Sequence, residues 1–148
     1  MVTEAQIWAW LSEVPDPEIP VLSLVDLGVI RGVKLGSEVV VKVSPTYTGC
    51  PATTVINLDI EAKLRSKGVE NLRLETQISP PWTTDWIRPE AYEKLRAYGI
   101  APPHKGQPSC PRCGATNTTR VSPFGSTPCK SHYKCAECLE PFDAFKCI

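Results

Sequence analysis

Four cysteines near the end of the chain stand in two Cys-x-x-Cys pairs, Cys110/Cys113 and Cys135/Cys138, with 21 residues between the pairs. Each pair lies beside turn-forming residues, so two tight turns would each present two thiolates to a common centre. Four thiolates around one centre suit a tetrahedral zinc ion, and we predict a structural zinc site with these four ligands. Two disulfides are the alternative interpretation of the same residues.

Cys50 is the second residue whose position favours chemistry. It stands between Gly49 and Pro51, and because proline is favoured in the first turn of a helix, Cys50 is expected at a helix N-cap. Unpaired N–H groups and the helix dipole favour a thiolate there, which could act as a nucleophile or as a soft metal ligand. The filling of a small buried space is an equally good interpretation of this position alone.

A Cys/His hydrolase would need a base near Cys50. The only two histidines, His104 and His132, lie far along the chain, and nothing in their spacing brings either one to Cys50. We interpret His132 as a surface or packing residue. Transient binding of a metal or an iron–sulfur cluster fits one soft ligand better, with the other ligands supplied by another loop, a second protomer or a partner.

Three carboxylates, Asp16, Glu18 and Asp26, precede the first predicted strand. Paired carboxylates could bind a metal or act as a base. Asp16 stands directly before Pro17, an arrangement common at the start of a turn, and we interpret it as a cap. Glu18 and Asp26 remain open between a structural and a chemical role.

Cys129 and Cys147 are left when the four predicted zinc ligands are set aside. Cys129 lies beside Lys130 in a turn-rich segment, so it is a candidate extra reactive thiol. It also precedes Cys135 by only six residues, which makes it the main rival for a ligand position. Cys147 is interpreted as a packing or frayed residue.

The elements expected before the cysteine-rich segment form a small α/β unit. Helices are predicted over 3–14, in a short stretch ending at Gly28, and over 51–66; strands are predicted over 29–35, 38–43 and 71–78, with a two-residue turn at Gly36-Ser37. The helix over 51–66 is expected to bury Val55, Ile56, Leu58 or Ile60, and Leu64. Strand, helix and strand in this order imply a right-handed crossover and a parallel pair. The fold class is therefore α/β (α+β), a small three-stranded mixed sheet with packed helices, followed by a C-terminal Cys₄ zinc ribbon.

The chain is expected to divide at 1–80, 81–106 and 107–148. The middle part holds Trp82 and Trp86, a short helix over 89–98 and a proline-rich linker. We interpret the segment from Trp82 to Trp86 as packing over an open sheet edge, and a patch that faces a partner is the alternative.

Composition narrows the function classes. The chain carries 16 Lys and Arg against 16 Asp and Glu, a neutral balance that argues against general nucleic-acid binding. Its first residues lack the features of a signal peptide, and no apolar stretch is long enough to span a bilayer. Seven cysteines, an odd number, without such a signal predict a reduced, cytoplasmic protein with no membrane association.

Three motifs resemble a known domain. They are Asp-Pro-Glu-Ile-Pro at 16–20, Ser-Leu-Val-Asp-Leu-Gly at 23–28 and Thr-Tyr-Thr-Gly-Cys-Pro-Ala at 46–52. In this order they look like the small iron–sulfur assembly domain of SufT and of cytosolic iron–sulfur targeting factors. With the segment from Trp82 to Trp86 and the cysteine-rich tail, nearly the whole chain resembles the PaaD (PaaJ) family of bacterial phenylacetate degradation. The part over 1–80 would then be the assembly domain.

The resemblance implies a cytoplasmic, non-catalytic accessory or maturation protein of the multicomponent phenylacetyl-CoA ring epoxidase, acting in aerobic phenylacetate breakdown. It implies that Cys50 handles iron or an iron–sulfur cluster and that the acidic motif from Asp16 to Glu18 accompanies it. Our hypothesis adds that Glu18 or Asp26 helps Cys50. The expected cofactors are structural zinc and a transient cluster or iron. The expected partners are the epoxidase components, including its iron–sulfur reductase. The alternative is a stoichiometric structural or electron-transfer-supporting subunit of the oxygenase complex.

Overall fold

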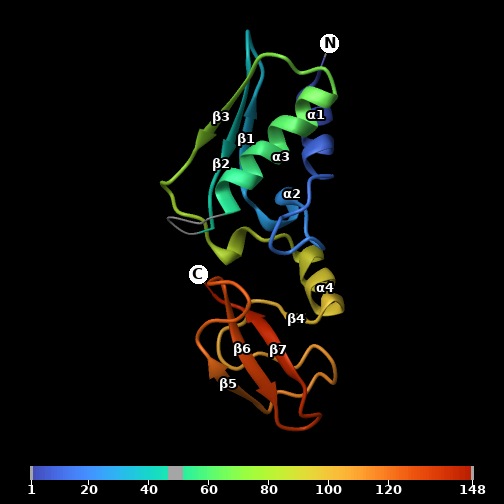
Figure 1. Cartoon of the computed structure of the whole chain (residues 1–148), viewed down its shortest axis with the longest axis vertical. Helices are drawn as coiled ribbons and strands as arrows, with labels where there is room; N and C mark the ends of the chain where they lie inside the picture. The colour runs from blue at the N-terminus through green and yellow to red at the C-terminus, as the bar shows by residue number, and fades with distance from the viewer. Residues whose placement is uncertain (1, 47–51, 148) are drawn as a thin grey trace. The chain divides into compact units, whose positions relative to one another are not determined.

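The structure, a computed structural model, describes residues 2–46 and 52–147. Its contacts divide the chain into two compact units, Met1–Trp82 and Thr83–Ile148, here named the N-terminal and the C-terminal unit. Within the described residues, each unit has its own β-sheet, of three strands in the first and four in the second (Figure 1). None of the helices in these ranges combines the length and the apolar character needed to cross a membrane.

A three-stranded mixed sheet forms the frame of the N-terminal unit, in the order β1 (Ile30–Lys34), β2 (Val39–Val43), β3 (Leu72–Thr76). β1 and β2 are antiparallel, and β2 and β3 are parallel. Helix α3 (Ala52–Ser66) lies between β2 and β3 in the sequence, so the predicted parallel pair is confirmed. α3 packs beside α1 (Glu4–Leu11), and both helices lie on one side of the sheet (Figure 1).

The core of this unit is aliphatic and lies between the helices and the sheet. Ile7 and Leu11 of α1, Val41 of β2, and Ile60 and Leu64 of α3 have no exposed surface. Burial of each such side chain contributes about 1.5–3 kcal/mol, so this packing, not surface ion pairs, holds the unit together.

Short-range signals set three of the helix ends. The start of α1 and the end of α2 (Leu24–Leu27) lie as predicted, whereas α1 itself ends at Leu11 and not at the predicted residue 14. Thr3 and Gln6 form a capping box at the start of α1, with hydrogen bonds of 3.0 and 3.2 Å. Ser23 and Asp26 form the equivalent box at the start of α2. Gly28 ends α2 with a φ of 79°, a left-handed conformation that glycine adopts without strain.

The buried face of α3 differs from the prediction. Its buried residues are spaced four apart: Ala52, Ile56, Ile60 and Leu64. The expected burial of Val55 is wrong, because this side chain is 44% exposed, and Ile60 takes the place in the core that Leu58 could have had. A stripe with a spacing of four is narrow, so residues three positions away from it fall on the outer flank of the helix.

The connection between β1 and β2 also differs. Lys34 pairs with Val40, so residues 35–39 lie between the paired ends, and the register is not that of a two-residue turn at Gly36-Ser37. A register shift between Ile30 and Gly32 marks a bulge farther along the same pair.

The C-terminal unit begins with a 3₁₀ turn η1 (Thr84–Trp86) and helix α4 (Pro89–Tyr98), which ends at Gly99 as predicted. A four-stranded sheet follows in the order β4 (Ile100–Ala101), β7 (Pro141–Phe145), β6 (Lys130–Cys135), β5 (Thr118–Ser122). β5, β6 and β7 are antiparallel neighbours, and β4 adds in parallel to β7. β4 could not be predicted from the sequence, because two residues carry no periodicity.

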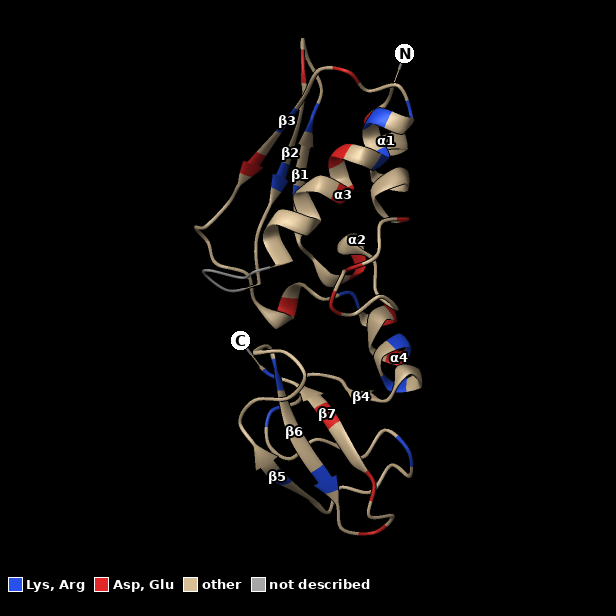
Figure 2. Ribbon diagram, viewed as in Figure 1, with Lys and Arg blue, Asp and Glu red and all other residues tan. Residues whose placement is uncertain are grey.

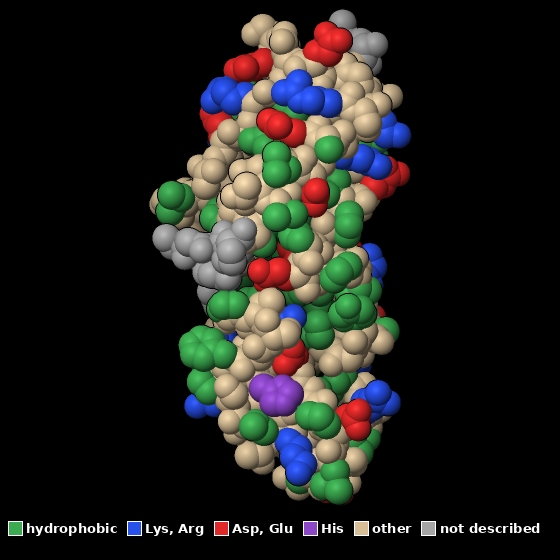
Figure 3. Space-filling view, viewed as in Figure 1, with side chains coloured by type: hydrophobic (Ala, Val, Ile, Leu, Met, Phe, Trp, Pro, Cys, Tyr) green, Lys and Arg blue, Asp and Glu red, His purple; other side chains and the backbone are tan. Residues whose placement is uncertain are grey.

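Charged residues of both signs are spread along both units in the ribbon view (Figure 2). On the face drawn in Figure 3, acidic and basic side chains of the described residues are interspersed. This distribution agrees with the neutral composition, which disfavours a general polyanion-binding surface.

Candidate functional site

The two Cys-x-x-Cys pairs converge in the C-terminal unit. The Sγ atoms of Cys110, Cys113, Cys135 and Cys138 all lie within 4.8 Å of one another. Two contacts join one pair to the other, at 3.7 Å between Cys110 and Cys138 and 3.5 Å between Cys113 and Cys135. A disulfide bond is about 2.05 Å long, so these four residues are thiols, as the zinc interpretation requires.

Both pairs sit in the same type of tight turn. The N–H of the first cysteine donates to the carbonyl five residues later, from Cys110 to Ala115 at 2.8 Å and from Cys135 to Glu140 at 3.0 Å. The residue after the second cysteine has a positive φ in both turns, 77° at Gly114 and 65° at Leu139. Two turns of one geometry therefore face each other, each with two sulfurs, as the residue spacing predicts.

The sulfur positions fit a tetrahedral metal site. Four sulfurs bound to zinc would lie about 3.8 Å apart, given a Zn–S distance near 2.3 Å. The separations of 3.5 and 3.7 Å and the upper limit of 4.8 Å bracket this value. In addition, the N–H groups of Glu137 and Cys138 donate to Sγ of Cys135 at 3.4 and 3.5 Å. Such bonds orient and stabilise a thiolate ligand.

Two of these thiols differ in acidity. The pKa of Cys135 is lowered to about 7, mainly by the hydrogen bond from the N–H of Cys138. Desolvation raises this pKa, and the hydrogen bond from the N–H of Glu137 lowers it further. For Cys138 the N–H of Glu140 acts in the same direction, but desolvation and the neighbouring thiols outweigh it and raise the pKa to about 12. Neighbouring sulfurs oppose the ionisation of one another, and a divalent cation reverses that opposition. The cluster is therefore built for a bound cation.

Cys129 does not belong to this group of four. It is buried, and its Sγ lies 2.9 Å from Oγ1 of Thr127. Within the described part of the chain, the structure therefore gives no support to Cys129 as a rival zinc ligand. Cys147 is exposed.

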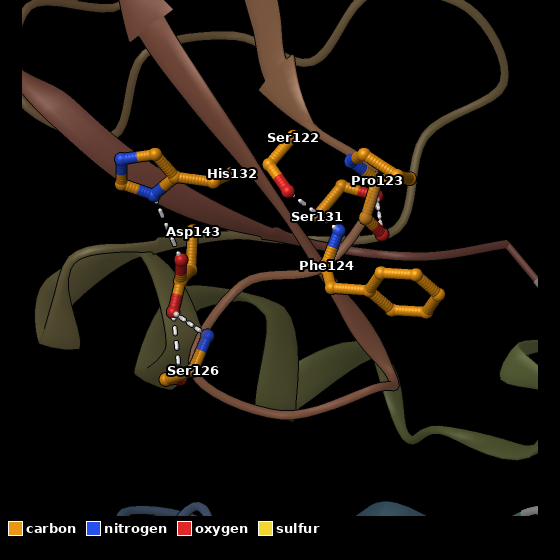
Figure 4. Close-up of polar contacts among 7 residues, drawn as sticks. All are labelled: Ser122, Pro123, Phe124, Ser126, Ser131, His132 and Asp143. Atoms are coloured by element: carbon orange, nitrogen blue, oxygen red, sulfur yellow. Dashed lines mark hydrogen bonds and ion pairs between the residues drawn. The ribbon is translucent and has the colours of Figure 1, made fainter.

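A polar cluster that the sequence did not predict lies on β6, β7 and the preceding loop (Figure 4). Nδ1 of His132 is 3.2 Å from Oδ1 of Asp143, while the hydroxyl and the N–H of Ser126 donate to Oδ2 at 2.7 and 3.3 Å. Partial burial raises the pKa of Asp143, but the bonds from Ser126 and His132 outweigh it and hold that pKa below its usual 3.8. Gly125 makes room for the carboxylate, since a Cβ there would be 2.6 Å from Oδ1.

His132 and Asp143 are brought together by the register of β6 and β7, which pairs these two residues. β6 and β7 flank the turn that contains Cys135 and Cys138. A hairpin centred on that turn would place His132 opposite Asp143. The interpretation of His132 as a surface or packing residue was therefore incomplete, because its ring helps to hold the loop over 123–126 through Asp143.

The acidic residues of the N-terminal unit act first as caps. Oδ1 of Asp16 accepts hydrogen bonds from the N–H groups of Glu18 and Ile19 at 2.9 and 2.8 Å, which confirms its predicted role. Asp26 is buried and accepts a bond from the N–H of Ser23 at 3.3 Å. Cys50 lies outside the described residues, so its N-cap position and its nearness to Glu18 and Asp26 stay predictions.

Trp82 is a packing residue. Its ring is buried, and Nε1 donates to the carbonyl oxygen of Leu27 at 3.0 Å. The end of α2 therefore depends on a residue that lies far along the chain.

Comparisons with known families match both units. Residues 4–72 match the family described as iron–sulfur cluster assembly protein, and residues 101–146 match the PaaD zinc beta ribbon domain. The second match covers the four converging cysteines.

One curated relative matches over nearly the full length. It is a protein of Escherichia coli described as a subunit of a putative 1,2-phenylacetyl-CoA epoxidase, 48% identical over 97% of this chain and 92% of the relative. Two solved structures resemble the N-terminal part. A domain of unknown function, DUF59, from Bacillus anthracis is 26% identical with a TM-score of 0.56, over 60% of this chain and 86% of that one. A conserved hypothetical protein from Thermotoga maritima is 31% identical with a TM-score of 0.54, over 64% and 94%.

Proposed function

The chain belongs to the PaaD family, and we therefore propose that it is an accessory or maturation protein of a phenylacetyl-CoA epoxidase in aerobic phenylacetate catabolism. Its task would be to handle iron or an iron–sulfur cluster through Cys50. The observation that carries the proposal is the 48% identity to an epoxidase subunit along 97% of the chain, joined to an iron–sulfur cluster assembly domain over 4–72.

In this proposal the two units have separate tasks. The N-terminal unit would carry the chemistry, with Cys50 as the soft ligand and Glu18 or Asp26 as helpers. Asp26 is already fixed by its capping box at the start of α2, so its carboxylate would be pre-positioned at little further cost in conformational entropy.

The C-terminal unit would be a zinc-stabilised docking module. Cys110, Cys113, Cys135 and Cys138 would hold a structural zinc ion, and zinc would supply the charge that keeps four thiolates together. Two of these cysteines, Cys110 and Cys135, are buried in the small core of the unit. A site closed by four protein ligands leaves no position for substrate, which argues for structure and against catalysis at this metal.

The proposal is that of a non-catalytic protein. Of the two histidines, the ring of His132 is bonded to Asp143, and His104 lies in the segment that follows β4. From the sequence, neither histidine is expected near Cys50, and a thiol without a base suits metal transfer better than acyl chemistry. The epoxidase components, with the iron–sulfur reductase as the client of maturation, would be the partners, and the cytoplasm would be the compartment.

The proposal is tested in cells that carry Cys50→Ser. We expect the iron–sulfur content of the epoxidase reductase and growth on phenylacetate both to fall. Cys147→Ser is the matched control, because Cys147 is exposed and outside the zinc cluster. Normal cluster loading and growth with Cys50→Ser would refute the cluster-handling role.

A second candidate function is that of a stoichiometric structural or electron-transfer-supporting subunit of the oxygenase complex. The description of the curated relative as a subunit favours it. Purified, fully matured epoxidase would be assayed with and without this chain. Turnover that needs its continuous presence would support the subunit role, whereas turnover that persists after its removal would support maturation.

A further inference from the structure

A pocket of about 330 Å³ opens on one face of the four-stranded sheet, apart from the cysteine cluster. Residues of β5, β6 and β7 and of the segment that follows β4 line it. The lining residues that matter for its chemistry are His104, Arg120, Ser131, Tyr133, Ala144 and Lys146. Ala144 pairs with Ser131 across β6 and β7, and their small side chains leave the hollow between the larger ones.

The charge of this pocket is one-sided. Arg120 and Lys146 are cations, and none of its described lining residues is a carboxylate. Residues 101–148 hold three acidic residues, Glu137, Glu140 and Asp143. Glu140 pairs with Arg112 at 3.4 Å, and both oxygens of Asp143 are used by Ser126 and His132. Neither cation of the pocket is therefore neutralised by these two carboxylates.

Ring contacts hold two polar groups of the pocket, Tyr133 and Lys146, and unused hydrogen-bonding capacity remains there. The ring of Tyr133 stacks on Phe142 at 5.9 Å with an interplanar angle of 17°. Nζ of Lys146 lies 4.4 Å from the centre of the Phe124 ring, a cation–π contact that leaves its N–H donors available. Among the described residues, neither the guanidinium of Arg120 nor the hydroxyl of Tyr133 has a hydrogen-bond partner.

We propose that this pocket binds the oxyanion group of a small molecule, a phosphate or a carboxylate, between Arg120 and Lys146. The planar guanidinium offers two parallel N–H donors to such a group, the ammonium adds a point charge, and the Tyr133 hydroxyl donates a further bond. The site is independent of the iron-handling role of Cys50 and of the zinc ligands. A concave pocket with two cations selects a small anion, whereas a nucleic acid would need a long basic surface.

The test uses the full-length, zinc-loaded protein in a dilute buffer without phosphate, titrated calorimetrically with inorganic phosphate and, separately, with acetate. We expect saturable binding of at least one anion with a Kd of about 1 mM or tighter. The preferred anion tells a phosphate ligand from a carboxylate ligand. Arg120→Gln and Lys146→Gln should each weaken binding about tenfold. Arg120→Lys keeps the positive charge but loses the two parallel N–H donors of the guanidinium. It should therefore weaken anion binding less than Arg120→Gln does.

Lys134→Gln is the matched control. Lys134 is an exposed cation next to Tyr133 on β6, and neighbouring residues on a strand point to opposite faces of the sheet. Zinc content and far-UV circular dichroism check that each variant is folded. Absence of saturable binding of both anions to the wild type would overturn the proposal. So would equal weakening by Lys134→Gln, which would indicate general attraction to the positive charge of the protein.

Discussion

Replacement of Gly125 by alanine is a direct test of the polar cluster around Asp143. A Cβ built on Gly125 would lie 2.6 Å from Oδ1, 2.9 Å from Cγ and 3.3 Å from Oδ2 of Asp143. Gly125 is not among the residues with a positive φ, so alanine brings no backbone strain. The clash with the carboxylate is the main perturbation, because all three nearest atoms belong to Asp143.

The carboxylate must move to accept the new methyl group. Movement of Asp143 gives up the bonds from His132 and Ser126, and hydrogen bonds to a charged group contribute about 1.5–3 kcal/mol when buried. Asp143 is only partly buried, so solvent screening reduces this amount. Overpacking in general costs about 1–3 kcal/mol, and we expect Gly125→Ala to lower the stability of the C-terminal unit by about 1–2 kcal/mol.

The assay must report on the C-terminal sheet itself. All four tryptophans, Trp8, Trp10, Trp82 and Trp86, precede that sheet in the chain, so fluorescence would follow other parts of the protein. Hydrogen exchange of peptides from β5, β6 and β7 in the zinc-loaded protein gives the local opening free energy. It is measured for wild type, Gly125→Ala, Asp143→Ala and the double variant.

Non-additivity is the decisive result. In the Asp143→Ala background the clashing carboxylate is gone, so Gly125→Ala should cost less than about 0.5 kcal/mol. Gly36→Ala, followed on peptides from β1 and β2, is the control for a glycine with room for a methyl group, because its Cβ would meet its nearest neighbour, the carbonyl oxygen of Glu38, at 3.8 Å. An equal cost of Gly125→Ala with and without Asp143 would refute the reasoning.

Three further predictions concern the zinc site and the core. Removal of zinc by chelation should abolish exchange protection in β5–β7 while β1–β3 keep theirs, because two of the five buried residues in one hydrophobic cluster of the C-terminal unit, Cys110 and Cys135, are proposed ligands. Protection that survives verified zinc loss would contradict the proposed structural role. Trp82→Phe keeps an aromatic ring but removes the hydrogen bond to Leu27. Urea unfolding followed by circular dichroism should show a free energy of unfolding that is lower by about 1–3 kcal/mol. An unchanged midpoint would show that the hydrogen bond contributes nothing. Leu139 is exposed and has a φ of 65°, which is strained for a residue other than glycine. Leu139→Gly should therefore raise the opening free energy of the ribbon by about 0.5–1 kcal/mol. A decrease would mean that the Leu139 side chain stabilises the turn.

Features that depend on neighbours in the sequence were predictable. The capping box at Thr3, the cap at Asp16, the left-handed Gly28 and the spacing of the zinc-ribbon cysteines all act within a few residues. Each follows from local hydrogen-bonding needs, so the residue types alone specify the local structure.

Features that depend on distant pairing were not predictable. The bulge in β1 shifts the register, so the length of the connection to β2 could not be read from Gly36-Ser37. The exposure of Val55 depends on which face of α3 meets the sheet. The contact between His132 and Asp143 exists only because β6 and β7 pair in one register.

The central claim is that the two kinds of metal chemistry occupy different cysteines: structural zinc at the converging four, and iron or a cluster at Cys50. Its most direct test is the metal content of anaerobically purified wild type, Cys50→Ser and Cys138→Ser. We predict that Cys50→Ser loses iron and keeps one equivalent of zinc, and that Cys138→Ser loses zinc. Iron unchanged in Cys50→Ser, or zinc retained in Cys138→Ser but lost in Cys129→Ser, would contradict the account.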